Sequence, residues 1–240
     1  MEKQDFKELL KIRAKKIGIQ LNEKQLELFW NYKKLILEWN EKINLTAIKD
    51  DANFINKHFI DSLTVCKYIN DNNSKIIDIG TGAGFPGVPI NIYKDNNIIL
   101  FDSLSKRLKI LDDVIKKLNL QNIQTLHGRA EETFKEKKYR ENFEIATSRA
   151  VANLNTLVEF MLPAIKIGGL CICMKAGNAE NEINDAKRAI EVLGGKIERI
   201  EECILPDTDI ERSIVIIRKV KKTPDFYPRK PGTPSKNPIK

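Results

Sequence analysis

Residue types that build specialised sites are scarce in this chain of 240 residues. It has two histidines and four cysteines (Cys66, Cys171, Cys173 and Cys203), too scattered for a structural zinc site or a disulfide framework. No apolar run approaches the roughly 20 residues that span a bilayer, and the first residues lack the apolar core of a signal peptide. We therefore expect a cytoplasmic protein with no metal site and no membrane association.

Positive charge is abundant, and it is concentrated towards the C-terminal end. The formal net charge is +8, and residues 211–240 carry nine Lys and Arg against Glu211 and Asp225. A basic surface confined to one end favours binding of a polyanion such as a nucleic acid, although a merely solvated tail gives the same pattern. Residues 223–240 are rich in proline and lack periodicity, which predicts an extended tail. The alternative is that Tyr227 and the prolines pin this tail to the core.

Three regions can be distinguished along the chain. Residues 1–72 are predicted to be a helical region, because apolar residues recur at three- and four-residue steps after Asn22, a plausible N-cap. From 73 to 222, short apolar runs alternate with amphipathic segments, which predicts a parallel doubly wound α/β sheet. In this region Gly168 and Gly169 are expected to end a helix. Residues 223–240 form the basic tail.

The segment "KIIDIGTGAGFPG" at 75–87 places four glycines directly behind a short apolar run. Gly82, Gly84 and Gly87 match the dinucleotide fingerprint G-x-G-x-x-G, whereas Gly80, Gly82 and Gly84 match the loop of an S-adenosylmethionine (SAM) pocket. Glycines at the carboxyl end of a strand let the backbone approach a ligand closely. Both patterns therefore predict a nucleotide-like cofactor at this loop.

The surrounding residues favour SAM over a dinucleotide. Pro86 and Pro89 delay the helix whose N-terminus would otherwise face a pyrophosphate. Asp102 ends the next apolar run, where a carboxylate can accept from both ribose hydroxyls of either cofactor. Asp78, just before the glycines, favours a cationic ligand. A nicotinamide-dependent oxidoreductase is thus the less favoured alternative.

Motifs along the whole chain resemble those of the RsmG (GidB) family. The matching segments are "WNEKINLTAI" at 39–48, "HFIDSL" at 58–63, "DIGTGAGFPGVPI" at 78–90, "DSLSKR" at 102–107, "GRAEE" at 128–132, "SRAV" at 148–151 and "YPRKPGTPSKNPI" at 227–239. Lys57 departs from the arginine that is more usual before the histidine, so a charge is kept but not the guanidinium fork.

The resemblance implies a class I SAM-dependent methyltransferase with a Rossmann-like sheet and an N-terminal helical extension. It implies methylation of guanine N7 in the 530-loop region of 16S ribosomal RNA, with that RNA or the small ribosomal subunit during assembly as partner, and we expect a monomer. Its cofactor site would comprise Gly80, Gly82, Gly84, Phe85, Asp102, Ser103, Leu104, Ala130, Glu131 and Arg149, beside Asp78. No catalytic residue is assigned, and Arg149 is the candidate at the mouth of the site. The candidates for binding RNA are His58, Lys106, Arg107, Lys175, Arg229 and Lys230.

The residues themselves also favour N7 as the methyl acceptor. Guanine N7 carries no proton at neutral pH, so its methylation needs proximity and no general base. Enzymes that methylate an exocyclic amine often have a D/N-P-P-aromatic turn after the fourth strand. The corresponding stretch here is "ATSRAVANL", which lacks this turn. Pyrimidine carbon-5 needs a cysteine nucleophile, and none stands there. Another RNA acceptor, a protein acceptor, or a non-catalytic RNA-binding module remain the alternatives.

Overall fold

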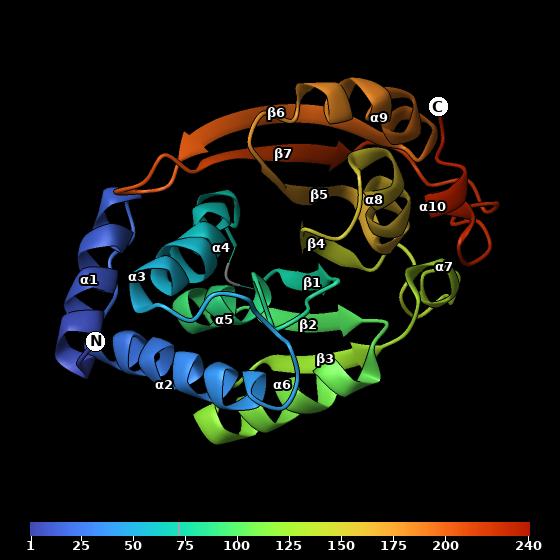
Figure 1. The fold of residues 1–240 in the computed structure, drawn as a ribbon. Helices are drawn as coiled ribbons and strands as arrows, with labels where there is room; N and C mark the ends of the chain where they lie inside the picture. Colours follow the sequence, from blue (N-terminus) through green and yellow to red (C-terminus); the bar gives the residue numbers. More distant parts are fainter. Residues whose placement is uncertain (72) are drawn as a thin grey trace.

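The fold is built on one seven-stranded sheet in the order β3-β2-β1-β4-β5-β7-β6 (Figure 1). The computed structural model describes residues 1–71 and 73–240. The strands are β1 (Lys75–Ile79), β2 (Asn97–Asp102), β3 (Ile123–His127), β4 (Phe143–Arg149), β5 (Ile165–Ala176), β6 (Gly195–Ile204) and β7 (Glu211–Lys219). Strands β1 to β5 pair in parallel, whereas β7 runs antiparallel between β5 and β6.

The predicted α/β architecture is confirmed, but the expectation of a wholly parallel sheet is wrong at one edge. A short connection, residues 205–210, joins β6 to β7 and turns the chain back on itself, so these two strands must pair antiparallel. Strand β6 gave no clear sequence signal, because it is an edge strand and most of its side chains are at least partly exposed.

Helices cover both faces of the sheet. One face carries the N-terminal elements α1 (Lys3–Lys16), α2 (Glu23–Asn40), α3 (Asp51–Phe54), the π-helical turn η1 (Ile55–Ile60), α4 (Asp61–Leu63) and the 3-10 turn η2 (Thr64–Tyr68), together with α5 (Gly87–Lys94) and α6 (Ser105–Leu118). The other carries α7 (Ala130–Thr133), α8 (Leu154–Met161), η3 (Leu162–Ala164) and α9 (Glu180–Val192). Of the helices in the described residues, none is both long and apolar enough to cross a membrane.

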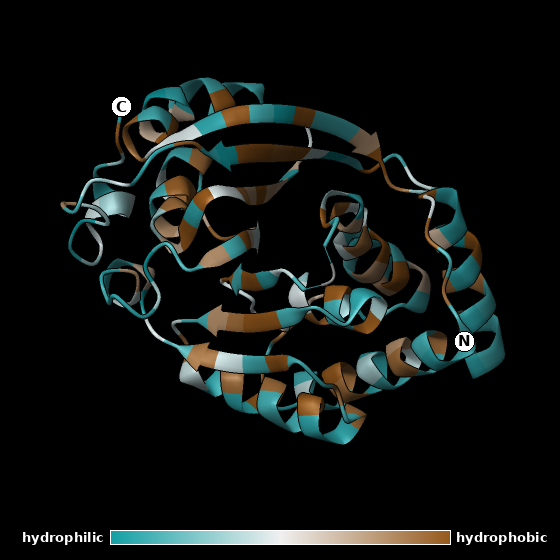
Figure 2. Ribbon diagram, turned by 180° about the vertical axis from the view of Figure 1, so that it is seen from behind, coloured by the Kyte–Doolittle hydropathy of each residue, from teal (hydrophilic) through white to brown (hydrophobic). Residues whose placement is uncertain are grey.

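Side chains that alternate along the inner strands belong to two separate apolar cores, one on each face of the sheet. Ile76 and Leu100 belong to the core beneath the N-terminal helices, whereas Ile77 and Phe101 belong to the core beneath α8 and α9. Both faces of these strands are therefore buried, which explains their nearly continuous apolar sequence, brown in Figure 2.

The predicted N-terminal helical region is present and packs directly on the sheet's own helices. Asn22 caps α2 through a capping box with Gln25, as its sequence position predicted. The Tyr32 hydroxyl of α2 donates to the carbonyl oxygen of Ala83 at 2.6 Å, so this region also supports the glycine-rich loop. The proposed boundary at residue 72 lies outside the described residues and stays a prediction.

The two consecutive glycines do not end a helix. Helix α8 already ends at Met161, and Gly168 and Gly169 lie inside β5, where the pairing with β4 shifts register. Gly168 has φ +87°, and a Cβ on Gly169 would lie 2.5 Å from the carbonyl oxygen of Glu144. The glycines thus permit a bulge in a long strand, a role that sequence alone does not separate from a helix stop.

Residues 223–240 are not a free tail. They fold back beside α7 and α8 and form the short helix α10 (Thr233–Lys236) (Figure 1). The alternative in which this segment is pinned to the core therefore describes the structure. The contacts that hold it are given below.

Candidate functional site

Two cavities open where the parallel strands end. The strand order reverses between β1 and β4, and ligands of doubly wound sheets bind beyond the carboxyl ends at such a point. The Asp102 cavity, of about 220 Å³, lies beside the ends of β1 and β2. The Arg149 cavity, of about 550 Å³, lies beside the end of β4. Val151, in the loop after β4, lines both.

Asp102 is positioned as a buried acceptor at the end of β2. Its carboxylate accepts hydrogen bonds from the backbone N–H groups of Gly82 at 3.0 Å and Leu104 at 2.9 Å, and the residue is 4% exposed. A carboxylate can accept about four hydrogen bonds, so two positions remain for groups in the cavity. This arrangement suits a pair of hydroxyl groups, such as those of a ribose.

The glycine loop brings bare backbone to the cavity at Gly80. This residue has φ +70°, and a Cβ built on it would lie 2.3 Å from Cγ2 of Val151. Gly82 has φ +60°, and this conformation aims its N–H at Asp102. Substitution at either position would strain the loop or fill the space beside it.

Asp78 does not line either cavity. It is fully buried and accepts hydrogen bonds from the Thr81 hydroxyl at 2.6 Å, the Gly87 N–H at 3.0 Å and the Thr147 hydroxyl at 3.2 Å. Burial raises the pKa of Asp78 to about 6, even though these donors favour its charged form. Its carboxylate fastens the glycine loop to α5 and β4. The expectation that it faces a cationic ligand finds no support in this position.

Three other predicted cofactor residues also lie away from the Asp102 cavity. Gly84 packs beneath α2, where a Cβ would lie 2.6 Å from the Tyr32 hydroxyl. Phe85 is 4% exposed and stacks on His58, with ring centroids 4.5 Å apart. Leu104 is 51% exposed immediately before α6. Their assignment to a cofactor stays a prediction.

Gly82 and Arg149 do not line the Asp102 cavity either, although the Gly82 N–H contacts Asp102 and Arg149 lines the other cavity. The other predicted residues of this group do line it. Ser103, Ala130 and Glu131 surround it together with Asp102. Two residues of the C-terminal segment, Gly232 and Ser235, also line it. The sequence does not point to these two residues, because their only local signal is a proline-rich basic segment, which predicts an extended or pinned tail and not a cofactor contact.

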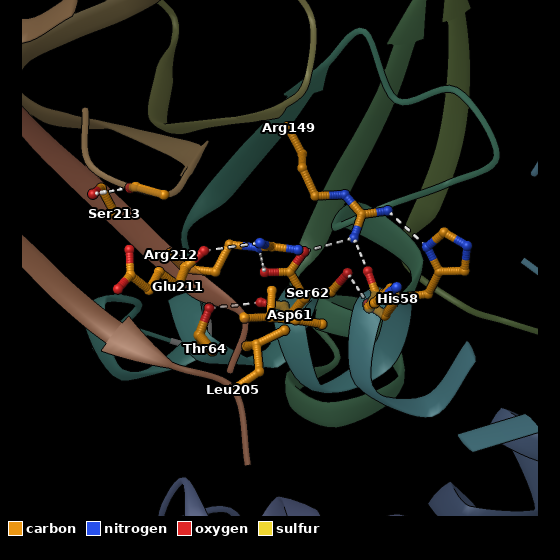
Figure 3. Close-up of polar contacts among 12 residues, drawn as sticks. His58, Asp61, Ser62, Thr64, Arg149, Leu205, Glu211, Arg212 and Ser213 are labelled. Carbon is orange, nitrogen blue, oxygen red and sulfur yellow. Dashed lines mark hydrogen bonds and ion pairs between the residues drawn. The ribbon is translucent and has the colours of Figure 1, made fainter. Parts of the chain in front are cut away.

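The Arg149 cavity contains a cluster of charged residues around one buried carboxylate (Figure 3). Asp61, 2% exposed, accepts from Nη1 of Arg149 at 3.1 Å and from Nε of Arg212 at 3.0 Å. Nη1 of Arg149 also donates to the carbonyl oxygen of Lys57 at 2.7 Å. Since Arg149 ends β4 and Arg212 lies in β7, this cluster joins the N-terminal helices to the middle of the sheet.

His58 extends this cluster as a neutral ring. Burial, with a smaller contribution from the Arg149 charge, lowers the pKa of His58 to about 3. Nδ1 is 3.1 Å from Nη2 of Arg149, which can only donate, so Nδ1 accepts. Nε2 therefore carries the proton and donates to the Thr46 hydroxyl at 2.8 Å. A neutral imidazole adds no positive charge for an RNA phosphate, although the ring does line the Arg149 cavity.

The other RNA-binding candidates divide by exposure. Lys106 and Lys230 are exposed, and Arg107 is partly exposed 3.7 Å from Asp102. Lys175 is 9% exposed, and its ammonium group contacts Glu182 at 2.6 Å.

Arg229 is already engaged within the protein. Its guanidinium donates to both carboxylate oxygens of fully buried Glu159, with Nη2 at 2.7 Å from Oε2. An RNA contact by any of these side chains stays a prediction. Within residues 1–71 and 73–240, no cluster of His, Cys, Asp and Glu could hold a metal ion.

The strand order, the antiparallel β7 and the cavity at the ends of β1 and β2 define a class I methyltransferase fold. The structure of M. jannaschii TYW2 in complex with AdoMet shares this fold, with a TM-score of 0.53 at 14% identity over 68% of this chain and 76% of that chain. The family model for rRNA small subunit methyltransferase G matches residues 25–215, and the chain belongs to this family.

Close relatives support the same assignment over nearly the full length. The ribosomal RNA small subunit methyltransferase G of Acetivibrio thermocellus is 48% identical over 98% of this chain and 97% of its own. The protein of that name from Clostridium novyi is 47% identical over the same shares. The resemblance found in the motifs is confirmed.

Proposed function

We propose that this protein transfers the methyl group of SAM to N7 of a guanine in the 530-loop region of 16S ribosomal RNA. Its family and its relatives' names support an RNA of the small ribosomal subunit as substrate. The proposal includes a monomer that acts in the cytoplasm, on the free RNA or on an assembling subunit. The geometry of the two cavities supports the chemistry.

The carrying observation is that both carboxylates and the imidazole that line the Arg149 cavity contact a cationic side chain. Asp61 is bound by two arginines, and Nδ1 of His58 accepts from one of them. Glu182 accepts from Lys175 at 2.6 Å and from the N–H of Leu154 at 3.0 Å. Among the described residues that line it, the cavity thus presents no carboxylate or imidazole without a cationic partner. Such a site suits an acceptor that loses no proton, and guanine N7 has an in-plane lone pair and no proton.

The residues of the Asp102 cavity fit SAM. Asp102 retains acceptor positions for the ribose hydroxyls, and the absence of a side chain at Gly80 leaves backbone facing the cavity. When bound, SAM supplies a methyl group on a positively charged sulfur, and transfer to N7 moves the positive charge to the guanine ring. The protein's contribution is to hold the two reactants in line and to exclude water.

Val151 lies between the proposed cofactor cavity and the proposed acceptor cavity. It lines both cavities, and its Cγ2 lies against Gly80 at the end of β1. A target guanine that enters beside Arg149 would therefore meet the cofactor across this side chain. Because the Arg149 cavity is only 550 Å³, the base must reach it unstacked from its neighbours.

The test is methyl transfer with mapping of the acceptor atom. The purified protein is incubated with SAM carrying a labelled methyl group and with small-subunit RNA, either naked or in 30S particles. We expect label at one guanine, with strand scission there after borohydride reduction and aniline treatment, which is diagnostic of N7-methylguanosine. An Asp102→Ala variant serves as the control for SAM-dependent labelling. Label on another atom, or on protein, would refute the N7 proposal, and SAM binding without transfer would indicate a binding module.

A further inference from the structure

The C-terminal strap, defined as residues 223–240, is anchored firmly at its start. Thr223 donates from its hydroxyl to the carbonyl oxygen of Leu193 at 2.7 Å. Arg140 donates to the carbonyl oxygens of Thr223 at 2.8 Å and Tyr227 at 2.7 Å. One arginine from the loop before β4 thus satisfies several strap carbonyls. This part of the strap follows a fixed path over the core.

A second anchor fixes the middle of the strap. The backbone N–H and the guanidinium of Arg229 both bind the carboxylate of Glu159 in α8, and Glu159 is fully buried. A buried carboxylate without a partner is strongly unfavourable, so the structure requires Arg229 here. Hydrogen bonding to Glu159 accordingly raises the pKa of Arg229.

Beyond this anchor the strap reaches the Asp102 cavity. The N–H of Gly232 donates to Oε1 of Glu131 at 3.1 Å, and the carbonyl oxygen of Pro234 accepts from the Thr156 hydroxyl at 3.2 Å. These bonds hold the turn 232–235 against α7 and α8. Gly232 and Ser235 thereby line the same cavity as Asp102.

We propose that the strap turn, residues 232–235, forms the outer wall of the cofactor pocket and contacts the adenosine part of SAM. The inference rests on the SAM-binding function proposed above. The turn lies on the side of Ala130 and Glu131, whereas the Arg149 cavity has no strap residue in its lining. It therefore faces the adenosine end and not the methyl group. A segment whose sequence predicts either an RNA-binding tail or a strap on the core is thus part of the cofactor site.

The strap turn can be perturbed without removing the anchors. Ser235 and Lys236 are adjacent and both exposed, but only Ser235 lines the cavity. Ser235→Trp places an indole in the cavity, and Lys236→Trp is the matched control. Truncation after Lys230 removes the turn and leaves Arg229 bound to Glu159.

Calorimetric titration of the full-length protein and these three variants with SAM tests the proposal, with melting temperatures measured alongside. We expect Ser235→Trp and the truncated protein to bind SAM at least tenfold more weakly, and Lys236→Trp to bind within twofold of the unaltered protein. Unchanged affinity in Ser235→Trp would overturn the proposal, even if the truncated protein is unstable. Equal weakening by both tryptophans would also overturn it. Failure of the unaltered protein to bind SAM would instead refute the proposed function itself.

Discussion

The assignment of Asp102 to the ribose hydroxyls can be tested by its energetic coupling to those hydroxyls. Two acceptor positions of the carboxylate are used by the N–H groups of Gly82 and Leu104, which leaves two for the ligand. Charge-assisted hydrogen bonds of this kind should contribute roughly 1–3 kcal/mol to binding, a factor of about 5 to 150 in Kd. Asp102→Ala should therefore weaken SAM binding by this factor.

The single substitution does not separate ribose contacts from loop support, because Asp102 also holds Gly82. We therefore pair it with a SAM analogue that lacks both ribose hydroxyls, in a double-mutant cycle measured by calorimetry. If Asp102 binds the hydroxyls, their removal should weaken binding to the unaltered protein by the full factor and to the variant by much less. Equal losses in both proteins would refute the assignment and leave Asp102 as a support for the loop alone.

Three further outcomes are expected. The pKa of His58 is lowered from 6.5 to about 3, so between these values the unfolded chain binds more protons and stability falls as pH falls. On going from pH 7 to pH 5, the free energy of unfolding of His58→Gln should therefore fall by roughly 2 kcal/mol less than that of the unaltered protein. Urea unfolding at the two pH values measures this, and equal decreases in both proteins would contradict it. Gly82→Val should weaken SAM binding at least tenfold by straining a residue at φ +60°, whereas Gly168→Val, at φ +87° in β5, should lower stability alone. The double variant Lys230→Gln, Lys236→Gln should bind RNA with a shallower dependence on salt. The slope of log K against log salt concentration should decrease in magnitude by about 0.7–0.9 per lost phosphate contact, and an unchanged slope would exclude both lysines from the interface.

The sequence was most informative where a residue's role depends on its neighbours along the chain. Gly80 directly follows β1 and Asp102 ends β2, and because these consecutive strands are parallel, both residues lie at one edge of the sheet. Asn22 caps α2 within a four-residue motif. These features follow from local periodicity and from the rules of parallel sheets. They could therefore be predicted without knowledge of distant contacts.

The sequence was least informative where a residue's role is set by a distant partner. Gly84 looks like a cofactor glycine, but a Cβ there would strike Tyr32, which lies on a separate helix. Asp78 looks like a ligand for a cation, but Thr81, Gly87 and Thr147 use its carboxylate. In both cases, residues of the glycine-loop motif are needed for packing the loop against the rest of the protein, and not only for binding a ligand.

The charge of the C-terminal region shows why a count of residues overstates a binding surface. Several of the cations between 211 and 240 are paired with carboxylates from elsewhere in the chain, namely Arg212 with Asp61, Arg218 with Glu198, Lys219 with Glu141 and Arg229 with Glu159. Two of these carboxylates, Asp61 and Glu159, are almost fully buried and would be strongly destabilised without an arginine. The charge left for RNA is therefore smaller than the sequence count. Exposed lysines such as Lys230 and Lys236 carry part of it, and they belong to the same strap as Gly232 and Ser235, which line the Asp102 cavity. If both proposals hold, RNA phosphates and the cofactor contact the same short segment, and RNA binding can stabilise the wall of the cofactor pocket.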